Sequence, residues 1–185
     1  MSKFGVKFKL TNNKNLPLTI FGSKVLKPIK FIEKRGSAQC KSSVIFGGMK
    51  TDGTSIIKAK KSRNHTELLC KYLNLPISIK IEKNFDKIKI RKVKKIKKLN
   101  YNIPCDISSS AFFLVLVSLL NNSNLVIKNV NINSSRTGII TILKKMGIKI
   151  LFNNQKIYKG EKIADIKIKS PKIIKPINCP PSLNS

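Results

Sequence analysis

Acidic side chains are scarce in this sequence: 185 residues hold 8 Asp and Glu against 38 Lys and Arg, for a formal net charge of +30. Tryptophan is absent and His65 is the only histidine. Four cysteines lie far apart without Cys-x-x-Cys spacing, which argues against a zinc site and indicates reduced cysteines of the core rather than a disulfide framework. We expect neither a metal nor a cofactor.

Long apolar runs are also missing. The longest, at 111–120, is too short to span a bilayer and is interrupted by Ser118. The N-terminal residues have no continuous apolar core and no small-residue cleavage site, so they do not resemble a secretory signal. These absences predict a cytoplasmic protein without a membrane partner.

The basic excess invites a nucleic-acid hypothesis, but arginine is nearly as scarce as acid. The charge comes from 34 lysines and 4 arginines spread along the whole chain. Dedicated nucleic-acid readers favour the arginine fork, whereas Lys, Ile and Asn all have A/T-rich codons. We favour compositional drift and expect no specific nucleic-acid partner. The alternative left open is a non-catalytic basic nucleic-acid-binding module.

Local patterns predict short strands alternating with helices. The predicted helices are 37–49, stopped by Gly47 and Gly48, then 66–73, 106–120 and 136–146. The predicted strands are 6–10, 18–21, 29–32, 55–59, 77–81, 87–93, 125–130, 148–152 and 163–168.

The elements predict an α/β (α+β) architecture of repeated units, in the order strand-helix-strand-strand-helix-strand, once before residue 100 and again after it. The lysine run 92–98 and the polar stretch to Cys105 mark the boundary between the two copies. The last seven residues read as a polar loop with no closing element, so we expect the chain to be cut short there.

Asp106 opens the most apolar stretch of the chain, with Ser108, Ser109 and Ser110 behind it. As a helix cap it would accept backbone N–H bonds. As a general base it would need a substrate hydroxyl within hydrogen-bond reach, and helix-terminal amides would lower its pKa and keep it ionised. Both interpretations fit the position.

Three further clusters lie at predicted helix starts. Ser37-Ala38-Gln39 could bind an anion or simply cap a helix. Arg63 could clamp a phosphate, while its neighbours could form a capping box, with Asn64 or Ser62 reaching forward and Glu67 reaching back. Arg136 follows Asn133-Ser134-Ser135, and its retention among so many lysines suggests that its fork geometry is needed.

Five motifs in order resemble one family. They are Ser-Ala-Gln-x-Lys-Ser (37–42), Ser-Arg-Asn-His-Thr-Glu (62–67), Asp-Ile-Ser-Ser-Ser-Ala-Phe-Phe-Leu (106–114), Asn-x-x-Arg-Thr-Gly-Ile (133–139) and Lys-Met-Gly-Ile (145–148). Together they resemble EPSP synthase (3-phosphoshikimate 1-carboxyvinyltransferase) of bacterial type, over nearly the whole chain.

The resemblance implies transfer of an enolpyruvyl group from phosphoenolpyruvate to the 5-hydroxyl of shikimate 3-phosphate, with release of phosphate, in the shikimate pathway to aromatic amino acids. It implies two lobes of repeated β-α-β-α-β-β units, no metal, and a monomeric full-length enzyme. Residues 1–99 would be the end of one lobe and 100–185 the truncated start of the second.

The resemblance also assigns roles to residues. Ser37 and Ala38 would contact the substrate phosphate, and Gln39 would reach both shikimate 3-phosphate and phosphoenolpyruvate. Arg63 would hold the phosphate of shikimate 3-phosphate. Asp106 would accept the proton of the attacking hydroxyl.

The sequence departs from the family pattern at three positions. Asn64 replaces the usual Asp, Ser134 a common Pro, and Cys105 the usual Gly, which permits backbone angles that cysteine resists. The family's Gly-Asp-Lys-Ser, Gly-Asn-Ser-Gly and Lys-Glu-Ser-Asp-Arg segments, which supply much of the phosphoenolpyruvate site, do not occur in these residues. We therefore expect the middle of the enzyme, less than half of it, without turnover on its own.

Overall fold

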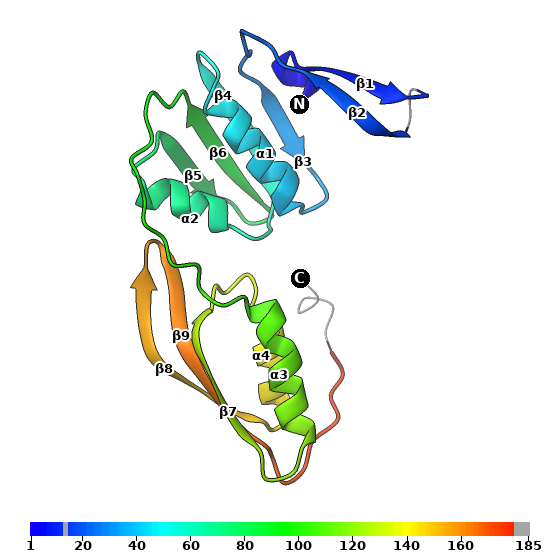
Figure 1. Ribbon diagram of the computed structural model, residues 1–185, viewed down its shortest axis with the longest axis vertical. Helices are drawn as coiled ribbons and strands as arrows, with labels where there is room; N and C mark the ends of the chain where they lie inside the picture. The colour runs from blue at the N-terminus through cyan, green and yellow to red at the C-terminus, as the bar shows by residue number, and fades with distance from the viewer. Residues whose placement is uncertain (13–14, 180–185) are drawn as a thin grey trace. The chain divides into compact units, whose positions relative to one another are not determined.

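Residues 1–12 and 15–179 are described by a computed structural model, whose backbone divides into two units, Met1–Lys98 and Leu99–Ser185 (Figure 1). The C-terminal loop expected at 180–185 lies outside the described residues. No helix in the described ranges is long and apolar enough to cross a membrane.

Unit 1 contains a complete β-α-β-α-β-β motif. Its elements are β3 (Lys30–Glu33), α1 (Ala38–Gly48), β4 (Thr54–Lys60), α2 (His65–Tyr72), β5 (Ile77–Ile81) and β6 (Phe85–Arg91). The strands form one sheet in the order β3-β4-β6-β5, in which β3 and β4 are parallel and the other pairs antiparallel. α1 packs on β3, β4 and β6, and α2 packs on β5.

Alternation along the strands separates a core face from an open face. Ile57 on β4 pairs in register with Ile88 on β6, and both are fully buried. Their neighbours Lys58 and Lys87 also pair and are exposed. Because side chains alternate between the two faces of a strand, the helices cover the apolar face and the lysines line the face opposite to them.

Helix α1 ends at Gly48 with Met49 as its C-cap, so the predicted helix at 37–49 and its end at the two glycines are confirmed. A Cβ on Gly47 would lie 2.6 Å from Cε2 of Phe4, and one on Gly48 would lie 2.4 Å from Cγ2 of Ile90. The glycines therefore mark the end of the helix and are also required by its close packing on Phe4 and Ile90.

An N-terminal hairpin precedes this motif. It consists of the short 3-10 helix η1 (Ser2–Phe4) and the strands β1 (Lys7–Thr11) and β2 (Asn15–Phe21). Among the described residues, these two strands pair only with each other. Phe4 is buried in the core of unit 1, whereas every described residue of the two strands is exposed.

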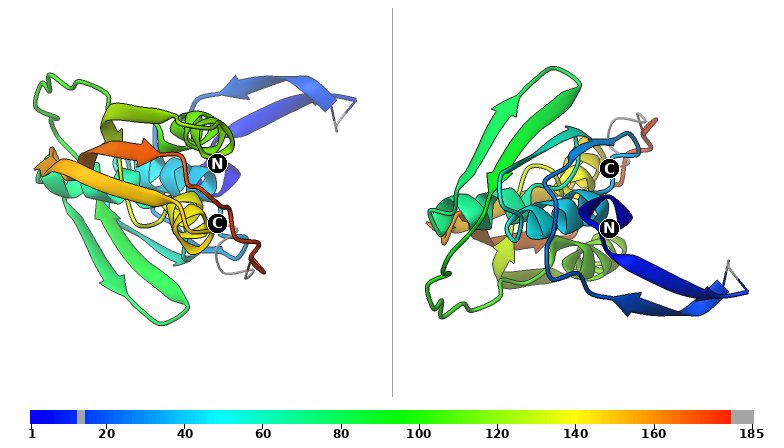
Figure 2. Two further views of the ribbon diagram at one scale, coloured as in Figure 1. Left: turned by 90° about the horizontal axis from the view of Figure 1, so that it is seen from below. Right: turned by 90° about the horizontal axis from the view of Figure 1, so that it is seen from above.

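Unit 2 repeats the motif with a reduced first strand. Its elements are α3 (Ile107–Leu119), β7 (Asn124–Asn131), α4 (Gly138–Lys145), β8 (Lys149–Tyr158) and β9 (Glu161–Lys169). The strands form an antiparallel sheet in the order β7-β9-β8, and Cys105 makes an isolated parallel bridge to Val130 of β7. In unit 2 this bridge takes the place that the parallel pairing of β3 with β4 has in unit 1. Both helices lie on one side of the sheet (Figure 2).

The predicted α/β class and repeated units are confirmed. The predicted order of elements is corrected to strand-helix-strand-helix-strand-strand, because the second helix of each unit follows the middle strand directly and the last two strands form a hairpin. The strand predicted at 148–152 is longer than expected. The carboxylate of Asp165 on β9 accepts hydrogen bonds from the backbone N–H of Asn129 and the side-chain amide of Asn154, both at 2.8 Å. These bonds stabilise the register shifts in β7 and β8, where the alternation of apolar and polar residues is interrupted.

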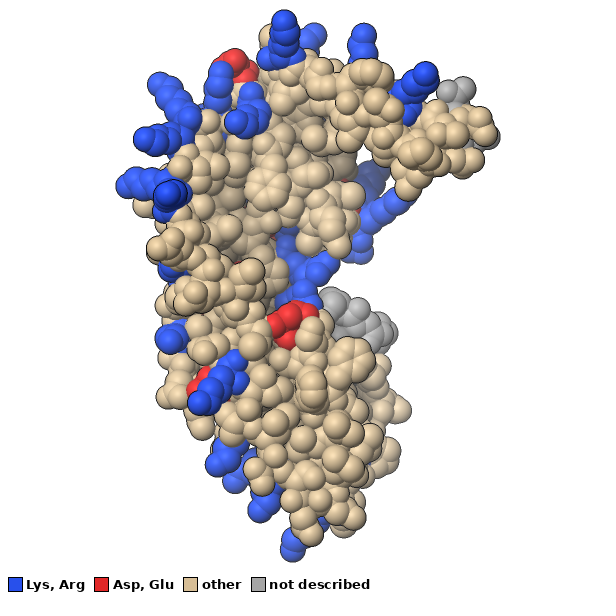
Figure 3. Space-filling view, in the orientation of Figure 1, with Lys and Arg blue, Asp and Glu red and all other residues tan. Residues whose placement is uncertain are grey.

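Helix α3 is apolar on both sides. Its inward residues Ile107 and Leu114 are buried, while Phe112 is 80% and Leu119 69% exposed. The area of unit 2 occupied by α3 in Figure 1 is accordingly almost free of charge in Figure 3. A helix that is hydrophobic all round is typical of one packed on both faces.

Candidate functional site

A buried carboxylate stabilises the turn that precedes α1. Glu33, at the end of β3, accepts the backbone N–H bonds of Arg35 and Gly36, both at 2.8 Å. Gly36 has φ +77°, which its lack of a Cβ makes accessible. Ser37 follows as the N-cap of α1, and its Oγ accepts the N–H of Cys40 at 3.2 Å. The predicted cap is confirmed.

This turn leaves backbone donors at the entry to α1. The N–H groups of Ala38 and Gln39 lie in the first turn, where no carbonyl of the helix precedes them. Gln39 is exposed, and Ser37 and Ala38 are half-buried. Such a helix start favours an anion through its free N–H groups and its dipole.

Lys41 connects α1 to the start of α2. Its Nζ donates to the carbonyl oxygen of Arg63 at 2.8 Å and lies 2.6 Å from Oε1 of Glu67. The Lys41 and Glu67 side chains are 1% and 5% exposed. A hydroxyl contact of 2.6 Å between Ser42 and Thr66 joins the same two helices. The predicted cluster at 37–39 lies at the start of α1 and Arg63 just before the start of α2. Hydrogen bonds and an ion pair join these two helices.

The capping box predicted at α2 is wrong. Asn64 is the N-cap residue, but its side chain makes no capping bond. The hydroxyl of Ser62 is buried without a hydrogen-bond partner in the described structure. Glu67 does not reach back, because the ammonium of Lys41 holds its carboxylate in the interior. Arg63 itself is half-buried, and its guanidinium makes no hydrogen bond or ion pair with the part of the chain that the structure describes.

Asp106 is the N-cap of α3. Its Oδ2 accepts the N–H of Ser109 at 3.2 Å and the Ser109 hydroxyl at 3.3 Å. Its Oδ1 lies 3.2 Å from Nη2 of Arg136, which also donates to the hydroxyl of Ser108. The Asp106 side chain remains 51% exposed. The cap is confirmed, and the carboxylate still faces solvent.

Several contacts act on the pKa of Asp106. Partial burial is the largest and raises the pKa, while the N–H groups of Ser108 and Ser109, the positive charge of Arg136 and the Ser109 hydroxyl lower it. The lowering contacts together outweigh burial, so the pKa of Asp106 lies below its ordinary value. The carboxylate is therefore ionised at neutral pH and able to accept a proton.

Arg136 is aimed at Asp106 by a turn built on a buried asparagine. Asn133 is 5% exposed, and its Oδ1 accepts the N–H and the hydroxyl of Ser135 at 2.9 and 2.8 Å. Its Nδ2 donates to Glu161 at 3.2 Å, and its carbonyl oxygen accepts the N–H of Arg136 at 2.8 Å. The sequence drew attention to Arg136 but did not reveal this pairing with Asp106.

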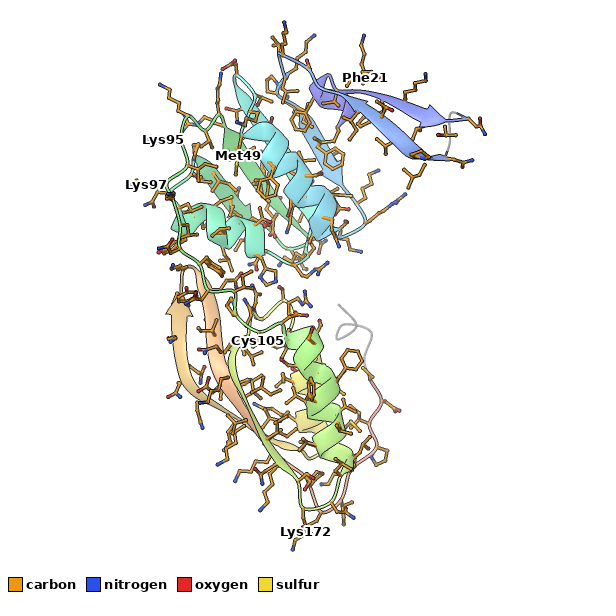
Figure 4. All side chains as sticks on the ribbon, in the orientation of Figure 1. Phe21, Met49, Lys95, Lys97, Cys105 and Lys172 are labelled. Atoms are coloured by element: carbon orange, nitrogen blue, oxygen red, sulfur yellow. The ribbon has the colours of Figure 1, made fainter. Side chains whose placement is uncertain are left out.

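Cys105 does not strain the approach to Asp106. Its N–H donates to the carbonyl oxygen of Asn129 and its carbonyl oxygen accepts the N–H of Asn131, both at 2.9 Å. Cys105 is not among the residues with positive φ, so a glycine is not needed for the backbone at this position. Figure 4 shows Cys105 directly before the first turn of α3.

Two other features lie apart from these residues. A groove of about 510 Å³ on unit 1 is lined by Thr54, Ile56, Pro76, Ile77, Ser78, Lys89 and Arg91, none of which belongs to the predicted site. Within residues 1–12 and 15–179, no three His, Cys, Asp or Glu side chains gather as metal ligands would.

Known proteins match this chain from end to end. The sequence profile of the family described as EPSP synthase (3-phosphoshikimate 1-carboxyvinyltransferase) matches residues 1–180. The 3-phosphoshikimate 1-carboxyvinyltransferase of Caldicellulosiruptor saccharolyticus is 39% identical over 172 residues, which are 92% of this chain and 40% of the relative. That of Hydrogenovibrio crunogenus is 36% identical over 185 residues, 99% of this chain and 41% of the relative.

Solved structures agree with the sequence matches. EPSP synthase from Acinetobacter baumannii superimposes with a TM-score of 0.82 at 34% identity, over 97% of this chain and 40% of that one. An enolpyruvyl transferase from Streptomyces tendae, at 14% identity and a TM-score of 0.61, shares the fold. The chain spans about 40% of the length of the relatives it matches. Because the family profile covers nearly all of its residues, this chain belongs to the EPSP synthase family.

Proposed function

We propose that these residues serve the transfer of an enolpyruvyl group from phosphoenolpyruvate to the 5-hydroxyl of shikimate 3-phosphate. The hydroxyl oxygen forms the new carbon–oxygen bond, the carbon–oxygen bond to phosphate breaks, and phosphate leaves. The relatives that match the chain are named for this reaction. They give no support to a basic nucleic-acid-binding module.

The start of α1 and Arg63 suit the phosphate of shikimate 3-phosphate. Ser37 offers a hydroxyl, and Ala38 offers a backbone N–H in the first turn of α1. Gln39, exposed one residue further, adds a side-chain amide that can reach both substrates. Arg63 supplies a guanidinium fork, which binds phosphate oxygens bidentately.

Asp106 suits the proton of the attacking hydroxyl, and its geometry is the observation that carries this proposal. It is ionised, half exposed, and fixed on both oxygens by Arg136 and Ser109. An oriented carboxylate that stays charged can accept a proton from an alcohol once the alcohol comes within hydrogen-bond distance.

The larger protein would follow the pattern of its family. Residues 1–99 would form the end of one lobe and residues 100–185 the start of the second. The net charge of +30 would favour the approach of two anionic substrates. A cytoplasmic location and a monomeric full-length enzyme remain predictions.

A chimeric enzyme tests the proposal. Residues of this chain would replace the matched 172 residues of the Caldicellulosiruptor saccharolyticus relative, and phosphate release would be measured with both substrates. We expect turnover by the chimera and none by the 185-residue protein alone. Asp106→Asn should lower kcat by about 100- to 10,000-fold, the usual contribution of a general base. Arg63→Lys, which keeps the charge but loses the fork, should raise the KM for shikimate 3-phosphate by about tenfold.

Asp52→Asn is the matched control, because Asp52 is an exposed carboxylate whose one ion pair among residues 1–12 and 15–179 is with Lys92 on the surface. It should leave kcat and KM unchanged. A folded chimera with no activity, or an Asp106→Asn chimera with full activity, would refute the proposed role.

A further inference from the structure

One arginine of the chain lies in a groove that the proposed reaction does not use. Arg63 and Arg136 belong to the candidate site, and Arg35 lies in the turn before α1. Arg91 is instead the last residue of β6, where it lines the groove of about 510 Å³ on unit 1. Because lysine supplies the charge almost everywhere else in this sequence, an arginine in a groove favours a ligand that its planar fork can bind.

The groove lies on the open face of the sheet, where neighbouring strands place their outward residues in rows. β6 lies between β4 and β5, so each outward residue of β6 has one neighbour on either side (Figure 1). Counted from the end of β6, the three rows are Thr54-Arg91-Pro76, Ile56-Lys89-Ser78 and Lys58-Lys87-Lys80. The first two rows line the groove and hold one cation between two neutral residues, whereas the third row consists of lysines.

Differences in side-chain length along these rows open the groove. Residues directly opposite each other on neighbouring strands have their Cβ atoms about 4.5–5.5 Å apart, so a short side chain leaves space beside a long one. In the first two rows, the long side chains of Arg91 and Lys89 stand between shorter or more rigid neighbours. The resulting volume is within the range of about 300–1,000 Å³ that is usual for small-molecule pockets.

The two cations of the groove carry uncompensated charge. Neither the Lys89 ammonium nor the Arg91 guanidinium makes a hydrogen bond or an ion pair with residues 1–12 and 15–179. None of the residues that line the groove is acidic. Asp52, two positions before Thr54, is paired with Lys92 at 2.6 Å. The groove therefore presents two positive charges to a ligand.

Hydroxyl and apolar groups flank these charges. Thr54 and Ser78 each occupy the position next to one of the cations, and each offers a hydroxyl that can donate a hydrogen bond. Ile56, Pro76 and Ile77 are half-buried and line the same groove. An anionic group with several acceptor oxygens thus fits beside an apolar surface.

We propose that this groove binds a small phosphate monoester, with its phosphate on Arg91 and Lys89 and its organic group on Ile56 and Pro76. A monoester carries about two negative charges and three acceptor oxygens at neutral pH, which match two cations and two hydroxyl donors. The arginine fork binds two of the oxygens, and the lysine ammonium adds a compact charge.

This binding site is independent of the proposed function. The groove shares no residue with the cluster at 37–39, with Arg63 or with Asp106. The ligand of the groove therefore need not be a substrate of the reaction, and each proposal can fail without the other.

A nuclear magnetic resonance titration of the 185-residue protein with phenyl phosphate tests the inference. At physiological salt, where exposed charges more than about 8 Å apart are largely screened, the backbone amide signals of Thr54, Ser78 and Arg91 should shift and saturate with one affinity. The amide signals of Ala38 and Gln39 report on the start of α1 separately. Two further probes test the ligand class. Inorganic phosphate lacks the organic group and benzoate carries a single charge, so each should bind the groove at least about threefold more weakly.

Two variants distinguish the groove from the general charge of the protein. Arg91→Gln removes the fork and should weaken binding by about tenfold or more. Arg91 is exposed, so the variant should keep the fold of unit 1. Lys87→Gln is the matched control, because it removes one charge from the same face of the same strand but lies outside the groove. It should change the affinity by less than about threefold.

The outcomes separate this inference from the proposed function. No saturable shift in the groove, or equal weakening by Arg91→Gln and Lys87→Gln, would overturn the binding site. Inorganic phosphate that binds as tightly as phenyl phosphate would overturn the assignment of a monoester in favour of a free anion. Saturable binding that Arg91→Gln alone weakens, together with an inactive chimera, would support the groove and count against the proposed reaction.

Discussion

The ion pair between Lys41 and Glu67 is the feature of unit 1 whose removal should cost most. Its charged atoms are 2.6 Å apart, and the side chains are 1% and 5% exposed. The Lys41 ammonium also donates to the backbone carbonyl of Arg63. We predict that Lys41→Met and Glu67→Leu each destabilise unit 1 severely, whereas the double variant does not.

The magnitude follows from desolvation. Removing one partner leaves the other charge buried and uncompensated, which costs about 3–5 kcal/mol. That is a large share of the roughly 5–15 kcal/mol by which a domain is stable. Replacing both partners by apolar side chains of similar volume removes both charges at once, and such replacements are neutral or stabilising by about 1–4 kcal/mol.

Cys70 provides an assay confined to unit 1. Its thiol is buried in the core of that unit, so it reacts with a thiol reagent only when the unit opens. With Cys40, Cys105 and Cys179, which are exposed, replaced by serine, labelling of Cys70 at increasing urea would give the free energy of unfolding of unit 1 alone.

An exposed pair with the same geometry serves as the control. Lys92 and Asp52 are also 2.6 Å apart, but their side chains are 50% and 78% exposed. Lys92→Met should change stability by less than about 1 kcal/mol. Losses below about 1 kcal/mol for both Lys41→Met and Glu67→Leu, or additive losses in the double variant, would refute the reasoning. A stable double variant with weakened phosphate binding in the chimera would show that Lys41 also positions Arg63.

Three further predictions concern single residues. Asp106→Ala should lower the free energy of unfolding by about 0.5–2 kcal/mol at pH 7. Because folding lowers the pKa of Asp106, the stabilisation by its carboxylate is present above its ordinary pKa near 4 and disappears as the pH falls through the folded value. Urea unfolding at pH 3 should therefore show a smaller difference between the two proteins, and an equal difference would contradict this account. Gly48→Ala should destabilise unit 1 by about 1–3 kcal/mol, because the new Cβ would lie 2.4 Å from Cγ2 of Ile90. This clash exceeds the gain of about 1 kcal/mol in helix propensity. Thermal unfolding measures the change, and a rise in Tm would contradict the prediction. Burial, aided by the charge of Glu67, raises the pKa of the Cys70 thiol to about 11. In the native protein, Cys40 should therefore react with a thiol reagent at pH 8 and Cys70 should not. Equal reaction rates would contradict the burial of Cys70.

Local chemistry made much of the fold predictable from the sequence. Ser37 and Asp106 cap helices because a short polar side chain before an apolar run satisfies free N–H groups, and this needs no knowledge of the rest of the chain. The alternation of isoleucine and lysine likewise predicted strands with one open face.

The errors and omissions share a physical cause, which is contact between residues far apart in the sequence. Glu67 was expected to cap α2, but Lys41, 26 positions earlier, takes its carboxylate into the core. Asp106 and Arg136 are 30 positions apart, and only the folding of unit 2 brings them together. No spacing rule predicts such pairs.

The open faces of the two sheets bear on how this protein acquired its charge. Every second residue of β6 and β9 points away from the helices, and lysine occupies positions such as Lys87, Lys89, Lys167 and Lys169 while the isoleucines between them remain buried. A genome that drifts toward A/T-rich codons can therefore replace half of a strand with lysine without altering the packed half. The fold separates the residues that composition can change from those that hold the units together, so the same architecture can persist while the net charge of the protein varies widely.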